Sequence, residues 1–236
     1  MLDFMNLSVL VIGGSSGVGL ATAQILDRMG ANVTIASRNL EKLHEAKRLL
    51  SDTAQHLELD VTDTAQIQAL QDSPCWDHVV ISAAETPMGG ILALNDDDAR
   101  HAMDSKFWGA YTAAKYIPVS AKGSIIFVAG YLSVRPGKAS ALQSAINAAL
   151  EALGRALALE LAPVRVNTVS PGLMDTKLWD SLPSQKRLEM FDMAANKLPI
   201  GRVGLPNDAA KAVCFLIDND YTTGSTVYVD GGGRIA

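Results

Sequence analysis

The stretch Leu7–Ala23, LSVLVIGGSSGVGLATA, decides the fold of this chain. It opens with an apolar, partly β-branched run that ends at Ile12, a pattern typical of a strand buried on both faces of a parallel sheet. A glycine-rich loop follows, and apolar residues then recur at helical spacing, at positions 20, 21, 25 and 26. Strand, loop and helix together place backbone N–H groups and a helix N-terminus where a pyrophosphate can bind. The stretch therefore predicts a dinucleotide site.

The glycine spacing narrows the type of loop. Gly13-x-x-x-Gly17-x-Gly19 differs from the G-x-G-x-x-G of the long Rossmann dehydrogenases. It resembles the T-G-x-x-x-G-x-G loop of the short-chain dehydrogenase/reductase family, with Ile12 where that family usually has threonine. The resemblance implies that the loop binds the cofactor through Gly13, Ser15, Ser16, Gly17, Val18 and Gly19.

The resemblance extends over nearly the whole chain and keeps the family's order. The later similar blocks are ALGRALALELAPVRVNTVSPG at 152–172, Asp175-Thr176, GRVGLPNDAAKAV at 201–213 and VDGG at 229–232. Strand and helix patterns also alternate along the chain, which favours a doubly wound parallel sheet. We therefore expect a single Rossmann-like α/β domain over residues 1–236, with about seven strands in the order 3-2-1-4-5-6-7. Residues 173–200, which read as largely irregular, are expected to form a loop and helix insertion on the substrate side.

Composition excludes several other classes of protein. The chain has 236 residues, of which 48% are hydrophobic and 19% charged, so it can form a sizeable core. The net charge of −5 is scattered, which argues against nucleic acid or an anionic membrane as a partner. No apolar run has the length of a membrane span, and no signal-peptide pattern is seen. Two cysteines far apart in sequence favour a reduced, cytoplasmic protein.

The second expected strand, at 32–36, ends at the residues that choose the cofactor. NAD enzymes tend to place an acid about twenty residues after the loop, where it binds the adenosine ribose. This chain has Ser37 and Arg38 instead, and a guanidinium can bind a 2′-phosphate through two hydrogen bonds. The alternative is an exposed arginine that caps the loop. We favour NADP over NAD.

Further cofactor contacts are implied by the family resemblance at the ends of later strands. Asp60 and Val61 follow the third strand, where contact with adenine is expected, although Asp60 can equally be the N-cap of the next helix. After the fourth strand the family usually has Asn-Asn-Ala-Gly, and this chain has Ser82-Ala83-Ala84-Glu85, in which the acid is unexpected. On the nicotinamide side the resemblance implies Pro171, Gly172 and Thr176.

The expected catalytic positions depart from the family. Its members use an Asn, Ser, Tyr, Lys set, in which the tyrosine moves the proton, the lysine binds ribose and lowers the phenol pKa, and the serine holds the carbonyl oxygen. Aligned by strand and helix order, the four positions hold Lys106, Gly130, Gln143 and Asn147. Gln143 can donate a hydrogen bond but has no proton to transfer, and Asn147 carries no charge.

Lys106 is the one ionisable replacement. In a partly desolvated cleft its pKa can fall, so that it can stand for the missing lysine or act as the acid. Alternatively it pairs with Glu85 or reaches solvent. A Tyr-x-x-x-Lys pattern does occur at Tyr111–Lys115, but it precedes the fifth strand, and Tyr111 is about 140° around the helix from Lys106.

Two acid-rich or small-residue segments complete the sequence evidence. Residues 95–98, NDDD, predict a capped helix start rather than a metal cluster, so no metal is expected. The helices expected at Asp97–Tyr116 and Ser140–Leu161 are rich in alanine and glycine, and family resemblance implies that they pair across a two-fold axis in a homodimer or homotetramer.

Two functions of different class therefore stand. The first is an NADP(H)-dependent oxidoreductase with a rebuilt active site, acting on a small carbonyl or alcohol-type substrate. The second is an NADP(H)-binding protein of the same ancestry that serves as a sensor, scaffold or partner subunit without hydride transfer. The retained phosphate loop favours cofactor binding in both.

Overall fold

A parallel sheet forms the centre of the molecule. The computed structural model describes residues 4–236, and its seven strands lie in the order β3-β2-β1-β4-β5-β6-β7, as the sequence predicted. All neighbouring strands are paired in parallel. The strands are β1 (Ser8–Ile12), β2 (Asn32–Ser37), β3 (Gln55–Glu58), β4 (Trp76–Ile81), β5 (Val119–Val128), β6 (Arg165–Pro171) and β7 (Thr226–Val229).

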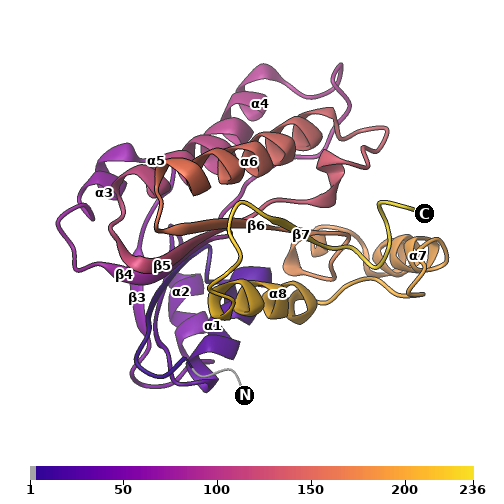
Figure 1. The fold of residues 1–236 in the computed structure, drawn as a ribbon. Helices are drawn as coiled ribbons and strands as arrows, with labels where there is room; N and C mark the ends of the chain where they lie inside the picture. The colour runs from indigo at the N-terminus through magenta and orange to yellow at the C-terminus, as the bar shows by residue number, and fades with distance from the viewer. Residues whose placement is uncertain (1–3) are drawn as a thin grey trace.

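Helices cover both faces of the sheet (Figure 1). One face packs against α1 (Gly17–Arg28), α2 (Leu40–Lys47) and α8 (Pro206–Asp218). The other packs against α3 (Thr64–Gln68), α5 (Gly109–Tyr116) and α6 (Ala141–Glu160), with α4 (Asp96–Met103) leading into α5. The strands alternate between the two cores: Val9 and Val11 of β1 face the first, and Leu10 and Ile12 face the second. A sheet buried on both faces requires such continuous apolar strands.

The helix expected at Asp97–Tyr116 is interrupted. It begins at Asp96, capped by the Asn95 side chain that accepts from the Asp98 N–H, which confirms the capped start. Between α4 and α5, residues Asp104–Trp108 form a π-helical turn. Such a turn inserts one residue into the helix and re-aims the side chains within it, which sequence periodicity cannot reveal.

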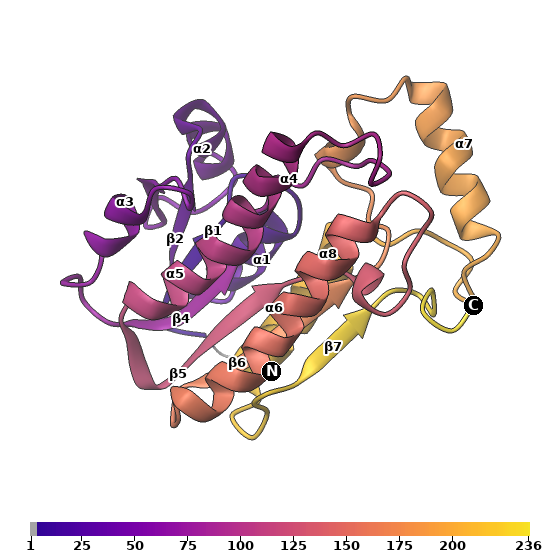
Figure 2. The ribbon, with the colours of Figure 1, turned by 90° about the horizontal axis from the view of Figure 1, so that it is seen from above.

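The segment after β6 leaves the sheet before the chain returns to it. Within residues 173–200 the structure has a short 3₁₀ turn at Lys177–Trp179 and one regular helix, α7 (Ser184–Ala195). Figure 2 shows α7 at the edge of the molecule, beyond β7 and near the C-terminus. The hydrophobic side chains of Leu188 and Met193 on α7 are exposed. Phe191 is the apolar residue of α7 that is buried.

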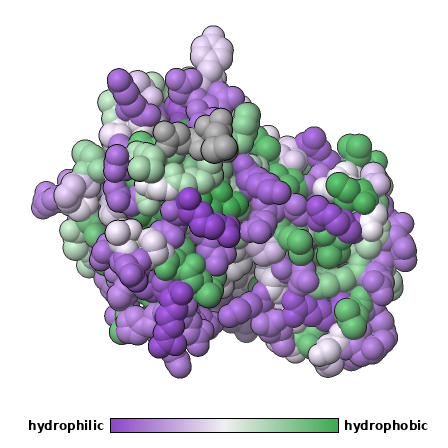
Figure 3. All heavy atoms as spheres, turned by 90° about the horizontal axis from the view of Figure 1, so that it is seen from below, coloured by the Kyte–Doolittle hydropathy of each residue, from purple (hydrophilic) through white to green (hydrophobic). Residues whose placement is uncertain are grey.

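On the face that carries α1, α2 and α8, hydrophilic and hydrophobic residues are interspersed (Figure 3). No helix in residues 4–236 is both long enough and apolar enough to cross a bilayer.

Candidate functional site

The loop between β1 and α1 is shaped by its glycines. Gly13 has φ +82°, and a Cβ built there would lie 2.5 Å from the Ala83 nitrogen, so only glycine allows the loop to lie against the end of β4. Gly17 has φ +55°, and a Cβ built there would lie 3.8 Å from the Thr176 methyl group. Two predicted contact regions, the loop and Thr176, therefore face one another.

The N-terminus of α1 offers unpaired donors. Its N-cap residue, Ser16, makes no side-chain cap hydrogen bond, and no acid occupies the first turn. The first N–H groups of a helix have no intrahelical partner and carry partial positive charge. Together with the close-packed glycines, this makes a cradle that fits a pyrophosphate.

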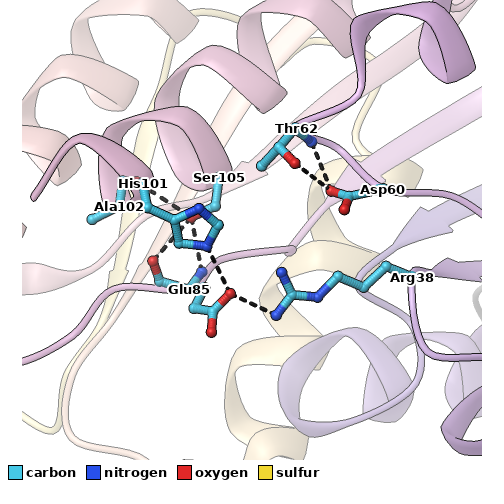
Figure 4. A network of polar contacts seen from close by, with 7 residues as sticks. All are labelled: Arg38, Asp60, Thr62, Glu85, His101, Ala102 and Ser105. Carbon is cyan, nitrogen blue, oxygen red and sulfur yellow. Dashed lines mark hydrogen bonds and ion pairs between the residues drawn. The ribbon is translucent and has the colours of Figure 1, made fainter. Parts of the chain in front are cut away.

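Two strand ends and the helix α4 bring three charged or polar side chains together (Figure 4). Arg38 follows β2, and its Nη2 lies 2.5 Å from Oε2 of Glu85, which follows β4. The same Glu85 oxygen is 2.8 Å from Nε2 of His101 on α4. Hydrogen bonds from His101 and then Arg38 hold the pKa of Glu85 below its ordinary value. The Arg38 side chain is half exposed, so it is an accessible cation with one carboxylate partner in the described chain.

Asp60 lies next to this group but is not the cap of α3. Its Oδ1 accepts from the N–H and the hydroxyl of Thr62, at 2.9 and 2.8 Å, and the cap of α3 is Asp63. Burial raises the pKa of Asp60, but the Thr62 hydrogen bonds and the nearby Arg38 outweigh it and leave that pKa lowered. A hollow beside it is lined by Arg38, Leu57, Asp60 and Gln66. The N-cap interpretation of Asp60 is therefore wrong, and the hollow leaves room for a flat ring.

A second group of polar side chains comes from α6, the end of β5 and the π turn. The buried stripe of α6 carries three polar side chains at four-residue spacing, Gln143, Asn147 and Glu151. A Cβ built at Gly130, just after β5, would lie 2.8 Å from Nδ2 of Asn147. Residue 130 must therefore be small for Asn147 to occupy its place.

Lys106, in the π turn, reaches the same group. Its Nζ donates to the Ala129 carbonyl at 3.0 Å, beside Gly130, and burial lowers its pKa to about 8. The alternative that it pairs with Glu85 is wrong, because Glu85 binds Arg38 and His101 instead. Three chain segments thus bring Lys106, Gly130 and Asn147 together.

Two buried amide oxygens on α6 have no hydrogen-bond partner among the described residues. Gln143, 6% exposed, donates from Nε2 to the Pro87 carbonyl, which fixes its orientation and leaves Oε1 without a donor. Oδ1 of Asn147, which is 4% exposed, is likewise unpaired. A buried acceptor without a donor costs about 1–3 kcal/mol, so both oxygens fit a ligand that supplies hydroxyl or N–H groups.

The similarity of this chain to known proteins agrees with this geometry. Residues 13–233 match the family model described as enoyl-(acyl carrier protein) reductase. The short-chain dehydrogenase/reductase ATR9 of Stachybotrys chlorohalonatus is 30% identical, with 95% of this chain and 96% of that protein covered. The chain belongs to the short-chain dehydrogenase/reductase family.

Two other similar proteins are dehydrogenases. The 4-formylbenzenesulfonate dehydrogenase TsaC1/TsaC2 of Comamonas testosteroni is 32% identical, over 98% of this chain and all of that protein. A solved structure of a small-chain dehydrogenase in complex with NADPH is also 32% identical, with a TM-score of 0.85, and covers 98% of this chain and 100% of that one.

The Tyr111 and Lys115 side chains pack against aromatic neighbours of their own helix region. Tyr111 is partly exposed on α5 and packs edge-on against Trp108, with ring centroids 5.8 Å apart. The Lys115 ammonium lies over the Tyr116 ring, 4.9 Å from its centroid. In the described residues, neither side chain makes a hydrogen bond or ion pair with Lys106, Gln143 or Asn147.

The sequence interpretation missed a buried acid. Glu151, 5% exposed, accepts hydrogen bonds from the hydroxyls of Ser133, Ser170 and Tyr228 at 2.6, 3.0 and 2.9 Å. Burial and then the Glu151 carboxylate raise the pKa of Tyr228. Glu151 follows Asn147 by four residues, and that spacing on one helix face could have indicated it. These hydrogen bonds connect α6 to β6 and β7.

The described residues contain no group of three or more His, Cys, Asp or Glu side chains able to hold a metal ion.

Proposed function

We propose that this protein is an NADP(H)-dependent oxidoreductase that acts on a small carbonyl or alcohol-type substrate through a rebuilt active site. The observation that carries the proposal is the position of the Lys106 ammonium beside Gly130, which adjoins Asn147 of α6, where Asn147 and Gln143 leave acceptors unpaired. The glycine loop and Arg38 would bind the dinucleotide.

The residues present fit the dinucleotide. Gly13, Ser15, Ser16, Gly17, Val18 and Gly19 would hold the pyrophosphate, and Ser37 and Arg38 the 2′-phosphate. Asp60 and Val61 would contact the adenine, and Ser82, Ala83 and Ala84 would line the floor at the end of β4. Pro171, Gly172 and Thr176 would border the nicotinamide, and Oδ1 of Asn147 would accept from a ribose hydroxyl. When bound, the cofactor supplies or accepts the hydride.

Lys106 supplies the proton in this proposal. An ammonium group with a pKa of about 8 gives up a proton readily near neutral pH, because general acids work best when their pKa is close to the working pH. Its hydrogen bond to the Ala129 carbonyl aims it at the space beside Gly130. Gln143, held by Pro87, orients the substrate through its free Oε1 and transfers no proton.

The cofactor preference is tested by thermal unfolding. Because only NADPH carries a 2′-phosphate for Arg38, it should raise the melting temperature more than NADH at equal concentration. At a hundred times its Kd a ligand adds about 2.7 kcal/mol of stability. Arg38→Asp should abolish the difference between the two cofactors. Equal shifts in the unchanged protein would refute the preference.

We also propose that the protein is a homodimer or homotetramer, paired through α5 and α6. These helices lie side by side on one outer face (Figure 2). Trp108 at the end of the π turn, Tyr111 on α5 and Leu159 on α6 are exposed. Exposed aromatics among small residues favour close helix pairing.

Light scattering at micromolar concentration should give a dimeric or tetrameric mass. Lys115→Glu should lower that mass, because it places an acid in the interface, and should leave NADPH binding unchanged. A monomeric mass for the unchanged protein would contradict the assembly.

A further inference from the structure

The Glu85 carboxylate is paired with Arg38, the residue that would bind the 2′-phosphate of NADPH. Its Oε2 lies 2.5 Å from Nη2 of Arg38, and the two residues come from the ends of β4 and β2, on either side of β1 (Figure 4). A carboxylate and a phosphate seek the same face of a guanidinium, with the same paired geometry. The two anions therefore cannot both hold that face of Arg38.

The backbone of Glu85 is fixed, so the competition depends on its side chain. The Ser105 hydroxyl, in the π turn, accepts from the Glu85 N–H at 3.1 Å and donates to the Glu85 carbonyl at 2.9 Å. Ser105 is buried. These two hydrogen bonds hold the Glu85 backbone against the π turn, so only its side chain needs to move for the carboxylate to leave Arg38.

His101 gives the displaced carboxylate a second partner. Its Nε2 contacts the same Glu85 oxygen, at 2.8 Å, from the α4 side. Glu85 can therefore leave Arg38 without being left unpaired. Both Arg38 and Glu85 are about half exposed, and ion pairs at such positions contribute little to stability. A phosphate dianion that accepts two hydrogen bonds from the guanidinium is the stronger competitor for Arg38.

We infer that Glu85 is a determinant of cofactor specificity, an internal competitor for the 2′-phosphate at Arg38 that lowers the preference for NADPH over NADH. The inference rests on the proposed NADP(H) binding. NADPH must displace the carboxylate toward His101, whereas NADH has no group that requires this. Asp60, the other acid near Arg38, is bound to Thr62 and makes no hydrogen bond to the guanidinium in the described structure.

The test compares Glu85→Gln with the unchanged protein by fluorescence titration of NADPH and NADH. Glu85→Gln should lower the Kd for NADPH about fivefold, which corresponds to ~1 kcal/mol, and change that for NADH less than about twofold. The matched control is Glu45→Gln, which removes the same charge from an exposed site on α2 and should change neither Kd.

A double variant asks whether Glu85 acts through Arg38. In an Arg38→Met background, Glu85→Gln should no longer alter the ratio of the two Kd values, because the shared guanidinium is gone. If NADPH binds the unchanged protein but Glu85→Gln leaves the ratio as it was, or weakens NADH instead, the competitor role is overturned and NADP(H) binding stands. If the unchanged protein binds neither cofactor, both proposals are overturned.

Discussion

Lys106→Met should lower the rate of substrate reduction by about 10²–10⁴-fold, the usual contribution of a general acid, while NADPH binding stays nearly unchanged. Methionine keeps the length of the buried stem and removes only the ammonium that donates to Ala129. The rate should be measured at the cofactor absorbance with a panel of carbonyl, imine and enone substrates. Lys122→Met, at an exposed lysine of β5, is the matched control and should keep full activity.

The pH dependence gives a second readout of the same group. The acid is the protonated form, so reduction should be constant below the lowered pKa of about 8 and should fall as the pH rises through it. The reverse reaction needs the neutral amine and should rise over the same range. Brisk ketone reduction that survives Lys106→Met would place the acid elsewhere. Tight NADPH binding with no turnover on any substrate would favour the non-catalytic sensor or scaffold instead.

Gly13→Ala should destabilise the protein by more than ~2 kcal/mol and abolish NADPH binding. A left-handed conformation costs an L-residue about 1–2 kcal/mol, and here the added methyl group also meets the Ala83 nitrogen at 2.5 Å. Relief of that clash would push the loop away from β4 and spoil the cradle for the pyrophosphate. Urea unfolding and NADPH titration measure the two effects.

Two other glycines serve as controls that separate the conformational cost of Gly13→Ala from the cost of its clash with Ala83. Gly201 also has a positive φ, +72°, but nothing lies within 4 Å of a Cβ built there, so Gly201→Ala should cost only the conformational ~1–2 kcal/mol. Gly90 has neither constraint, and Gly90→Ala should stay within about 0.5 kcal/mol of the unchanged protein. If Gly13→Ala were no worse than Gly201→Ala, the close approach to Ala83 would not be what the loop requires.

The sequence by itself determined the fold and the position of the cofactor loop. Both depend on local patterns: an apolar strand, the glycines from Gly13 to Gly19 and the start of α1 follow one another within twenty residues. The alternation of strands and helices then leaves a parallel sheet as the arrangement that buries both faces. The strand order itself came from the family resemblance and agrees with the structure.

Only the tertiary structure decided which distant residues Glu85 and Lys106 contact. Glu85 was unexpected in the sequence, but its pairing with Arg38 joins residues 47 positions apart, through strand ends that meet only in the folded sheet. Lys106 had several possible partners, and the π turn selects the Ala129 carbonyl by adding a residue that shifts the helix face. Local patterns carry no information on such contacts, because sheet order and a single inserted helical residue set which distant side chains meet.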